Sequence, residues 1–241
     1  MTATLRGVIR PTPSPDRGWF ITIEGPEGAG KTTQAARLEA HLVGHGVAVV
    51  RTREPGGTRL GEQIREILLR AAGGDEVSID PLADALLFNA ARRQLVDEVI
   101  RPARAAGRTV ICTRFADSTL AYQGFGAGVP LAVLRSLQDI ATGGLRPDLT
   151  ILLDLPAEVG LARKVPDDRT RFETAFDLAF HERVRAGFRT LAEAEPERFA
   201  VIDAEQPEHD VAAEIERVIH RLRGAAAPAD EPPHAPERIP R

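Results

Sequence analysis

Apolar runs and segments of helical periodicity alternate along most of this chain. Near-continuous apolar runs, which are typical of buried strands, occupy residues 19–24, 47–53, 108–115, 148–155 and 198–204. Apolar positions recur at helical spacing over 32–46, 58–74, 130–142, 156–164, 173–195 and 207–223, and an Asp-Pro pair at 80–81 opens a long helix that reaches about residue 105. This alternation predicts a three-layer α/β/α domain with a five-stranded parallel sheet, whose ligand lies beyond the carboxyl ends of the strands.

The two ends of the chain differ from this pattern. Residues 1–17 and 224–241 hold three and five of the 18 prolines, respectively. Segments of that composition bury too little apolar surface to fold. We therefore expect a single domain over 18–223, between a disordered N-terminal extension and a disordered Pro/Ala-rich tail.

The composition argues against several classes of protein. The formal net charge of −4 lacks the basic excess of a general nucleic-acid binder. No run approaches the roughly 18 apolar residues that a membrane-spanning helix needs, and residues 1–20 lack the apolar centre of a signal peptide. The single Cys112 excludes an internal disulfide framework and a multi-cysteine zinc site. We expect a cytoplasmic protein without a membrane or nucleic-acid partner.

A glycine-rich loop follows the first predicted strand. The sequence GPEGAGKTT at 25–33 fits the pattern G-x-x-x-x-G-K-[ST], with a strand before it and a helix after it. In such a loop, backbone N–H groups and the positive end of the helix surround phosphate oxygens, Lys31 reaches the β- and γ-phosphates, and the Thr32 hydroxyl ligates Mg²⁺. The residues expected to bind ATP are Gly25, Gly28, Ala29, Gly30, Lys31, Thr32 and Thr33. The acid inside this loop, Glu27, is unexpected at an anion site.

Further polar stretches gather at the same edge of the predicted sheet. TREPGGT at 52–58 follows the second strand, and TRFADSTLAYQG at 113–124 follows the third. In FNAAR, Phe88 and Arg92 share one helix face. They either stack on and hydrogen-bond a planar ring, or form a core aromatic and a solvated charge, and the spacing alone favours the second interpretation. The basic segment 161–173 is either a lid over phosphates or a charged surface loop.

These blocks, in this order, resemble those of bacterial thymidylate kinases, which belong to the P-loop nucleoside monophosphate kinases. The blocks are IEGPEGAGKTT, TREPGGT, FNAAR, TRFADSTLAYQG and RPDLTILLD, and the resemblance extends over about residues 18–223. TREPGGT and AYQG distinguish this family from other nucleoside monophosphate kinases. The resemblance implies a P-loop NTPase fold, phosphorylation of dTMP to dTDP by MgATP, and a homodimer, for which the long helix 80–105 supplies a candidate apolar face.

The resemblance also assigns residues to the acceptor nucleotide. By similarity, Phe88 stacks on the thymine ring and Arg92 hydrogen-bonds its edge, which reverses the interpretation that spacing favours. Thr119 contacts the base. Tyr122 lies where a ribose would carry its 2′-hydroxyl and so excludes ribonucleotides, with Gln123 beside it.

The chemistry that the resemblance implies is phosphoryl transfer between two polyanions. Arg53 and Arg114 hold the acceptor phosphate, because a guanidinium suits phosphate geometry. Lys31, Arg114, Mg²⁺ and a lid cation align and neutralise the reactants. The phosphate loop carries no arginine, so we expect the lid to supply that cation, and Arg163 is preferred. The other cations of the lid, which the sequence does not rank, are Lys164, Arg169 and Arg171.

Two positions depart from the family pattern. The family usually has Asp-Arg after the third strand, whereas this chain has Thr113 before Arg114 and so lacks a carboxylate that commonly supports Mg²⁺. Either Glu27 and the ATP phosphates hold the metal, or the enzyme is slow. We therefore count Glu27 among the catalytic residues, and with Thr32 among the metal residues. In the lid, DDRTRFE matches the family's D-R-[IF]-E either at 168–169 with an insertion, or at 170–173 with threonine in place of aspartate.

Two alternative functions remain. A kinase for another nucleoside monophosphate would use the same scaffold, but Phe88, Arg92 and Tyr122 argue against it. A nucleotide-binding regulatory protein that has lost catalysis would explain Thr113, but the intact Lys31 argues against that. A signalling GTPase would need an N-K-x-D motif, which the sequence lacks.

Overall fold

The structure is a computed structural model that describes residues 17–69, 79–164 and 170–226. Most of the two expected disordered extensions, and Arg169 of the expected lid, lie outside the described residues. Five parallel strands form one sheet in the order β2-β3-β1-β4-β5. The strands are β1 (Phe20–Glu24), β2 (Val49–Arg53), β3 (Thr109–Thr113), β4 (Leu149–Asp154) and β5 (Phe199–Asp203). All five lie where the sequence predicts them, to within two residues at each end.

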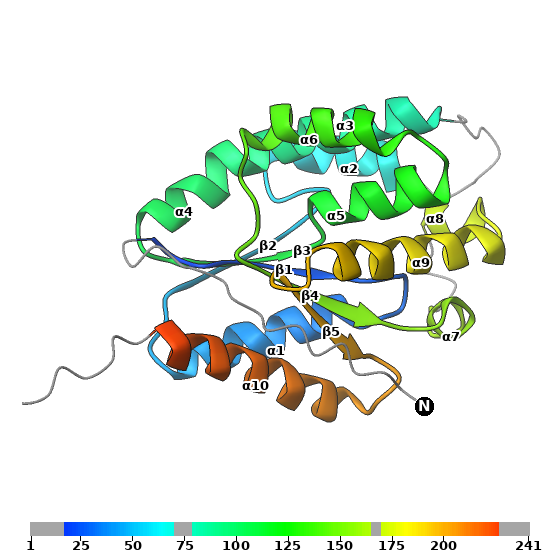
Figure 1. Cartoon of the computed structure of the whole chain (residues 1–241). Coiled ribbons are helices and arrows are strands. Elements are labelled where there is room, and N and C mark those ends of the chain that lie inside the picture. Colours follow the sequence, from blue (N-terminus) through cyan, green and yellow to red (C-terminus); the bar gives the residue numbers. More distant parts are fainter. Residues whose placement is uncertain (1–16, 70–78, 165–169, 227–241) are drawn as a thin grey trace, which may run out of the picture.

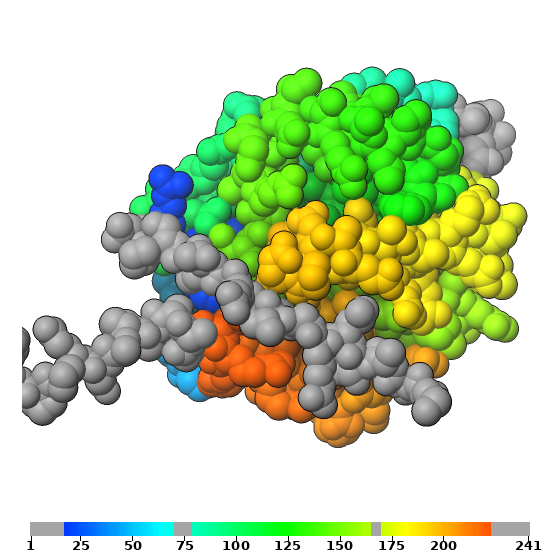
Figure 2. Space-filling view, in the orientation of Figure 1, coloured from blue at the N-terminus to red at the C-terminus, as the bar shows by residue number. Residues whose placement is uncertain are grey.

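Helices cover both faces of this sheet, so the predicted three-layer α/β/α fold is confirmed. Helices α1 (Lys31–Gly44) and α10 (Glu208–Ala226) lie side by side on one face, and α3 (Pro81–Leu95), α6 (Leu131–Thr142) and α9 (Leu178–Ala194) lie on the other (Figure 1). In the space-filling view, α9 lies between α6 and α10 (Figure 2). Further helices are α2 (Arg59–Leu69), α4 (Arg101–Ala105), α7 (Ala157–Ala162) and α8 (Arg171–Thr174). Among the described residues, no helix is both long and apolar enough to cross a membrane.

Side chains of the central strand β1 point alternately to the two faces of the sheet and so contribute to the core on both faces. Ile21 packs into the cluster shared with α1 and α10, whereas its neighbour Phe20 packs on the opposite side with Leu95 and Phe115. Successive strand residues point to opposite faces, so a strand that is covered on both sides is apolar throughout. This is why these strands are visible in the sequence as continuous apolar runs.

The predicted long helix over 80–105 is present as one helical path. Asp80 caps it, because its carboxylate accepts hydrogen bonds from the N–H groups of Leu82 and Ala83. The path continues from α3 through the π-helical turn η1 (Val96–Ile100) into α4. The Asp-Pro pair at 80–81 was sufficient to predict where this helix begins.

Two helical segments differ from expectation. Residues 116–126 form α5 (Ala116–Thr119) and a π-helical turn, η2 (Leu120–Gly126), whereas the sequence predicts no helix there. Glycines weaken the helical signal, but Gly126 is required for packing, since a Cβ there would lie 2.7 Å from the ring of Phe180. The helix expected over 173–195 is divided into α8 and α9, and Asp177 caps α9 by accepting from the Phe180 N–H.

Candidate active site

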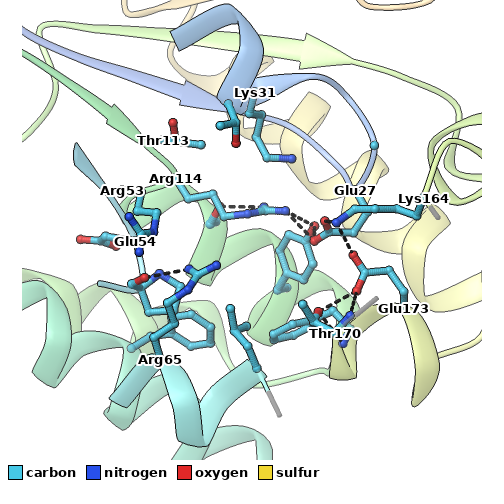
Figure 3. Close-up of a pocket in the computed structure, with 18 of the residues that line it drawn as sticks. Glu27, Lys31, Arg53, Glu54, Arg65, Thr113, Arg114, Lys164, Thr170 and Glu173 are labelled. Carbon is cyan, nitrogen blue, oxygen red and sulfur yellow. Dashed lines mark hydrogen bonds and ion pairs between the residues drawn. The ribbon is translucent and has the colours of Figure 1, made fainter. Parts of the chain in front are cut away.

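A cavity of about 510 Å³ lies at the carboxyl ends of β1, β2 and β3, where the parallel sheet predicts a ligand site (Figure 3). It brings together most of the residues that the sequence singles out. Of the expected site residues, those that line it are Glu27, Gly28, Gly30, Lys31, Thr32, Thr33, Arg53, Phe88, Arg114, Thr119, Tyr122, Gln123 and Arg163. Gly25, Ala29 and Arg92 do not line it.

The loop between β1 and α1 has the conformation of a phosphate cradle. Gly25, Gly28 and Gly30 have φ values of 143°, 69° and 83°, which side chains disfavour. A Cβ at Gly28 would stand 2.0 Å from the carbonyl oxygen of Gly160 in α7, so glycine alone permits this packing. Helix α1 begins directly after the loop, at Lys31. The positive end of a helix and its unpaired N–H groups therefore face the cavity, as anion binding requires.

Lys31 lies folded against this loop. Its Nζ donates to the carbonyl oxygens of Gly25 at 3.0 Å and Pro26 at 2.5 Å. Burial, reinforced by the positive charge of Arg114, lowers the pKa of Lys31 to about 7. A phosphate bound beside Lys31 would place a negative charge next to its amino group and would therefore favour the protonated form.

Arg114 is the centre of the charged network. It follows β3 with a φ of 64°, an uncommon conformation for a residue other than glycine. Its guanidinium donates to Glu27 Oε1 at 2.5 Å, to the Tyr122 hydroxyl at 3.0 Å and to the Gly25 carbonyl at 3.2 Å. The Ser118 hydroxyl lies 3.3 Å away. The strained backbone thus directs one guanidinium to both the phosphate loop and the acceptor side.

Cations surround Glu27, and this explains why an acid is present in a loop that binds anions. Its carboxylate accepts from Arg114 and from the Tyr122 hydroxyl at 2.9 Å, and Lys164 Nζ lies 3.8 Å away. Burial alone would raise the pKa of Glu27, but the charges of Arg114 and Lys31 outweigh it and hold the pKa well below its usual range. Glu27 therefore stays ionised and orients the cations that face the cavity.

The acceptor side contains a buried ion pair. Phe88 lines the cavity, but Arg92 is only 1% exposed and lies behind the cavity wall. Its guanidinium donates to both carboxylate oxygens of Glu54, and the shortest of these hydrogen bonds is 2.7 Å and the longest 3.2 Å. It also donates to the Thr119 hydroxyl at 3.0 Å. The structure thus places Arg92 where it positions Glu54 and Thr119, whereas the resemblance predicts direct contact with the base.

The lid is described on both sides of 165–169. Arg163 lines the cavity and donates to the Ala204 carbonyl at 3.0 Å, whereas Lys164 lies 2.9 Å from Glu173 and closer to the charged network. Arg171 is not a lid cation in this geometry, because it is buried and pairs with Asp84 at 2.6 Å.

Thr170 and Glu173 determine the register after the lid. Thr170 is the N-cap of α8, and it forms a reciprocal capping box with Glu173. Aspartate is another preferred N-cap residue. The structure therefore favours the alignment in which Thr170 replaces the aspartate of the family pattern.

Some polar cavity residues were assigned no role from the sequence. Glu54 and Ser118 lie inside quoted motifs, but nothing in their spacing distinguishes them from neighbouring polar residues. Arg65 of α2 lines the cavity and donates to the Pro55 carbonyl at 2.9 Å. Burial and the nearby charge of Arg53 lower the pKa of Arg65. Arg65 adds a third guanidinium to the acceptor side, which helical periodicity alone does not reveal.

A second buried carboxyl group, that of Glu24, holds the segment next to Arg114. Glu24, the last residue of β1, accepts from the Phe115 N–H at 2.7 Å and pairs with the Ser118 hydroxyl at 2.6 Å. Burial, together with the negative charge of Asp117, raises the pKa of Glu24 to about 7. Glu24 therefore fixes the turn that carries Arg114.

Known proteins resemble this chain over most of its length. The family model described as thymidylate kinase matches residues 23–215. The chain is 56% identical to a thymidylate kinase of Deinococcus radiodurans, over 83% of this chain and 95% of that protein. It is 52% identical to a thymidylate kinase of Synechococcus sp. (strain JA-3-3Ab), over 87% of this chain and 98% of that protein. A crystal structure of thymidylate kinase from Ehrlichia chaffeensis superimposes with a TM-score of 0.67 at 36% identity, and covers 84% of this chain and 98% of that one.

Proposed function

The chain belongs to the thymidylate kinase family and phosphorylates dTMP to dTDP with ATP, and on that premise we propose how its residues bind and align the two nucleotides. The observation that carries the proposal is one cavity with two differently built ends. The phosphate loop and Lys31 form one end, and Phe88, Arg53 and Arg65 form the other. ATP binds at the first end and dTMP at the second.

The dTMP end matches its ligand in charge and shape. The phosphate of dTMP binds between Arg53 and Arg114, and Arg65 adds further positive charge. Arg53 holds Glu62 at 3.0 Å and is about half exposed, so it is accessible to a phosphate. The thymine ring stacks on Phe88, and the base edge meets Thr119, whose hydroxyl Arg92 holds in place.

The reaction follows from this placement. An oxygen of the dTMP phosphate attacks the γ-phosphorus of ATP, the bond from that phosphorus to the β–γ bridging oxygen breaks, and ADP leaves. The acceptor phosphate is already largely deprotonated near pH 7, so the protein supplies alignment and positive charge, with no strong base needed. Lys31 and Arg114 contact the two sides of the transferring group, and Glu27 keeps Arg114 in the required orientation.

The residues present suit Mg²⁺. The metal prefers oxygen ligands and keeps several waters when phosphates bind it. The Thr32 hydroxyl lies at the start of α1 beside Lys31 and is the direct protein ligand we propose, while Thr113 lines the cavity where a carboxylate is usual. Glu27 is engaged by Arg114 and Lys164, so we propose that it acts toward the metal through bound water. When bound, Mg²⁺ neutralises the β- and γ-phosphates.

The proposal extends to assembly and location. Leu82 and Leu86 of α3 and Ile140 of α6 are 41%, 50% and 75% exposed, and α3 and α6 are neighbours (Figure 1). An exposed apolar set on two adjacent helices is typical of an interface between subunits. We propose a cytoplasmic homodimer that pairs through this surface. If the protein is such a dimer, analytical ultracentrifugation should give twice the monomer mass for the wild type, and Leu86→Glu should shift the protein to the monomer. A wild type that is monomeric at micromolar concentration would contradict the proposed dimer.

An acceptor panel tests the function. Purified protein with MgATP is given dTMP, dUMP, UMP, CMP, AMP or GMP, and ADP release is measured. We expect dTMP to have the highest kcat/KM. Faster turnover of another acceptor would establish the alternative kinase, and ATP binding without turnover of any acceptor would establish the regulatory alternative.

A further inference from the structure

A cluster of three histidines lies on the face of the sheet that α1 and α10 cover, opposite to α3 (Figure 1). His41 belongs to α1, His45 is the C-cap residue that follows α1, and His220 belongs to α10. The ring centroids lie 4.4 Å apart for His41 and His45, 5.2 Å for His41 and His220, and 5.8 Å for His45 and His220. One ring nitrogen from each residue lies within 4.8 Å of the other two. None of these rings belongs to the kinase site, because His45 follows Lys31 by a helix length of about 21 Å.

The fold explains why these rings meet. His41 and His45 are four residues apart, so they lie on one face at the end of α1. Helix α10 packs alongside α1 through apolar residues such as Leu42 and Ile219, and His220 follows Ile219 directly. The core contact therefore holds the two neighbouring helices (Figure 1) in a register that brings three imidazoles together, two of them exposed.

Two of the rings have an oxygen atom close to Nδ1. His45 Nδ1 lies 2.8 Å from the His41 carbonyl oxygen, which can only accept, so this nitrogen carries the proton. His41 Nδ1 lies 3.3 Å from a carboxylate oxygen of Glu216. A proton on Nδ1 of His45 leaves the Nε2 lone pair of that ring to ligate a metal, and a carbonyl or carboxylate partner is the usual outer contact of a metal-binding histidine.

We propose that His41, His45 and His220 bind a divalent transition-metal ion of the zinc class, with solvent as the remaining ligand. Three neutral imidazoles are a donor set that suits zinc, and histidines at i and i+4 on a helix are a recurring half of such sites. Tetrahedral bonds of 2.0–2.1 Å place ligand nitrogens about 3.3 Å apart, so the rings close by about 1.5 Å on binding. His45 and His220 are exposed and have room for that movement.

The bound ion would connect the end of α1 to α10. Helix α1 carries the phosphate loop at its other end, and α10 is the last described helix of the chain. A metal that binds only the folded state stabilises it by mass action. The proposed metal site thus links α1 to α10 and is separate from the site at which Mg²⁺ would bind.

Zinc titration of the full, untagged chain tests this proposal. The protein is first treated with EDTA and dialysed, and ZnCl₂ is then titrated by calorimetry without nucleotide. The cluster variants are His45→Gln and His220→Gln, and the matched control is His209→Gln, an exposed histidine on the same helix α10. Kinase activity with MgATP and dTMP checks that each variant is folded, because none of these residues lines the cavity.

We expect one zinc ion per chain, at least tenfold weaker binding in each cluster variant, and unchanged binding in His209→Gln. Zinc at a hundredfold excess over Kd should raise the Tm of the wild type by about 5–10 °C, and that of His220→Gln by much less. Visible absorption bands of tetrahedral Co²⁺ should appear with the wild type and disappear with His220→Gln. Equal zinc affinity in wild type and His220→Gln, or no saturable binding, would show that the rings pack together without a metal function.

Discussion

Replacing Glu54 by glutamine removes one charge from the buried pair beneath the acceptor side. Arg92 and Glu54 have side-chain exposures of 1% and 3%, so almost no water is available to solvate a guanidinium that loses its partner. Breaking such a pair from one side costs about 3–5 kcal/mol. We take the lower value, about 3 kcal/mol, because Asn89, Thr119 and the Phe115 carbonyl still accept hydrogen bonds from Arg92.

Thermal unfolding converts this cost into an observable. For a chain of this size, 1 kcal/mol shifts Tm by about 2–4 °C, so Glu54→Gln should lower Tm by roughly 6–12 °C. The double variant Glu54→Gln with Arg92→Met removes both charges and should recover at least half of the loss. Asp97→Asn is the control, because its pair with Arg93 is exposed on the same helical path and should contribute under about 1 kcal/mol.

Two results would refute this reasoning. A loss below about 1 kcal/mol for Glu54→Gln would mean that the pair is solvated in solution. A double variant less stable than Glu54→Gln would mean that Arg92 acts through its packing and neutral hydrogen bonds rather than through its charge.

Four further predictions concern the kinase site. Lys31→Ala should lower kcat by about 100-fold or more with an unchanged circular dichroism spectrum, and normal turnover would remove Lys31 from the phosphate role. Tyr122→Ala should reduce the ratio of kcat/KM for dTMP over UMP by about tenfold, and an unchanged ratio would exclude Tyr122 from ribose discrimination. Thr113→Asp should lower the Mg²⁺ concentration for half-maximal rate by roughly tenfold, and identical Mg²⁺ curves would show that the missing carboxylate is unimportant. The folded-state pKa of Glu24 is raised from 4.5 to about 7, so its contribution to stability is present at low pH and is lost as pH rises through 7. Glu24→Gln should therefore gain about 2 kcal/mol over the wild type between pH 5.5 and 8.5 in urea unfolding, and a pH-independent difference would contradict the buried, protonated carboxyl.

Local patterns were sufficient to predict the sheet and the phosphate loop. Strands such as β1 are apolar on both faces, and the glycines of the loop have one dominant use after a strand, so both are visible without tertiary information. The strand order was not predictable, because pairing of β1 with β3 and β4 depends on contacts far apart in the chain.

Site residues that depend on tertiary pairing were harder to predict. The spacing of Arg92 favours a solvated charge and the resemblance a contact with the base, but its guanidinium lies in the interior, paired with Glu54, 38 residues away. Arg65 enters the cavity only because α2 packs beside TREPGGT. Helix α5 and η2 were missed because Gly124 and Gly126 weaken the local signal, while their packing against α6 and α9 stabilises the turn.

The most direct test of the account is the crystal structure of this chain with dTMP bound. The account predicts the thymine ring on Phe88 and the phosphate between Arg53 and Arg114, with Glu27 still bonded to Arg114. A dTMP phosphate seated in the glycine loop on Lys31, with the base away from Phe88, would contradict the assignment of the two ends of the cavity.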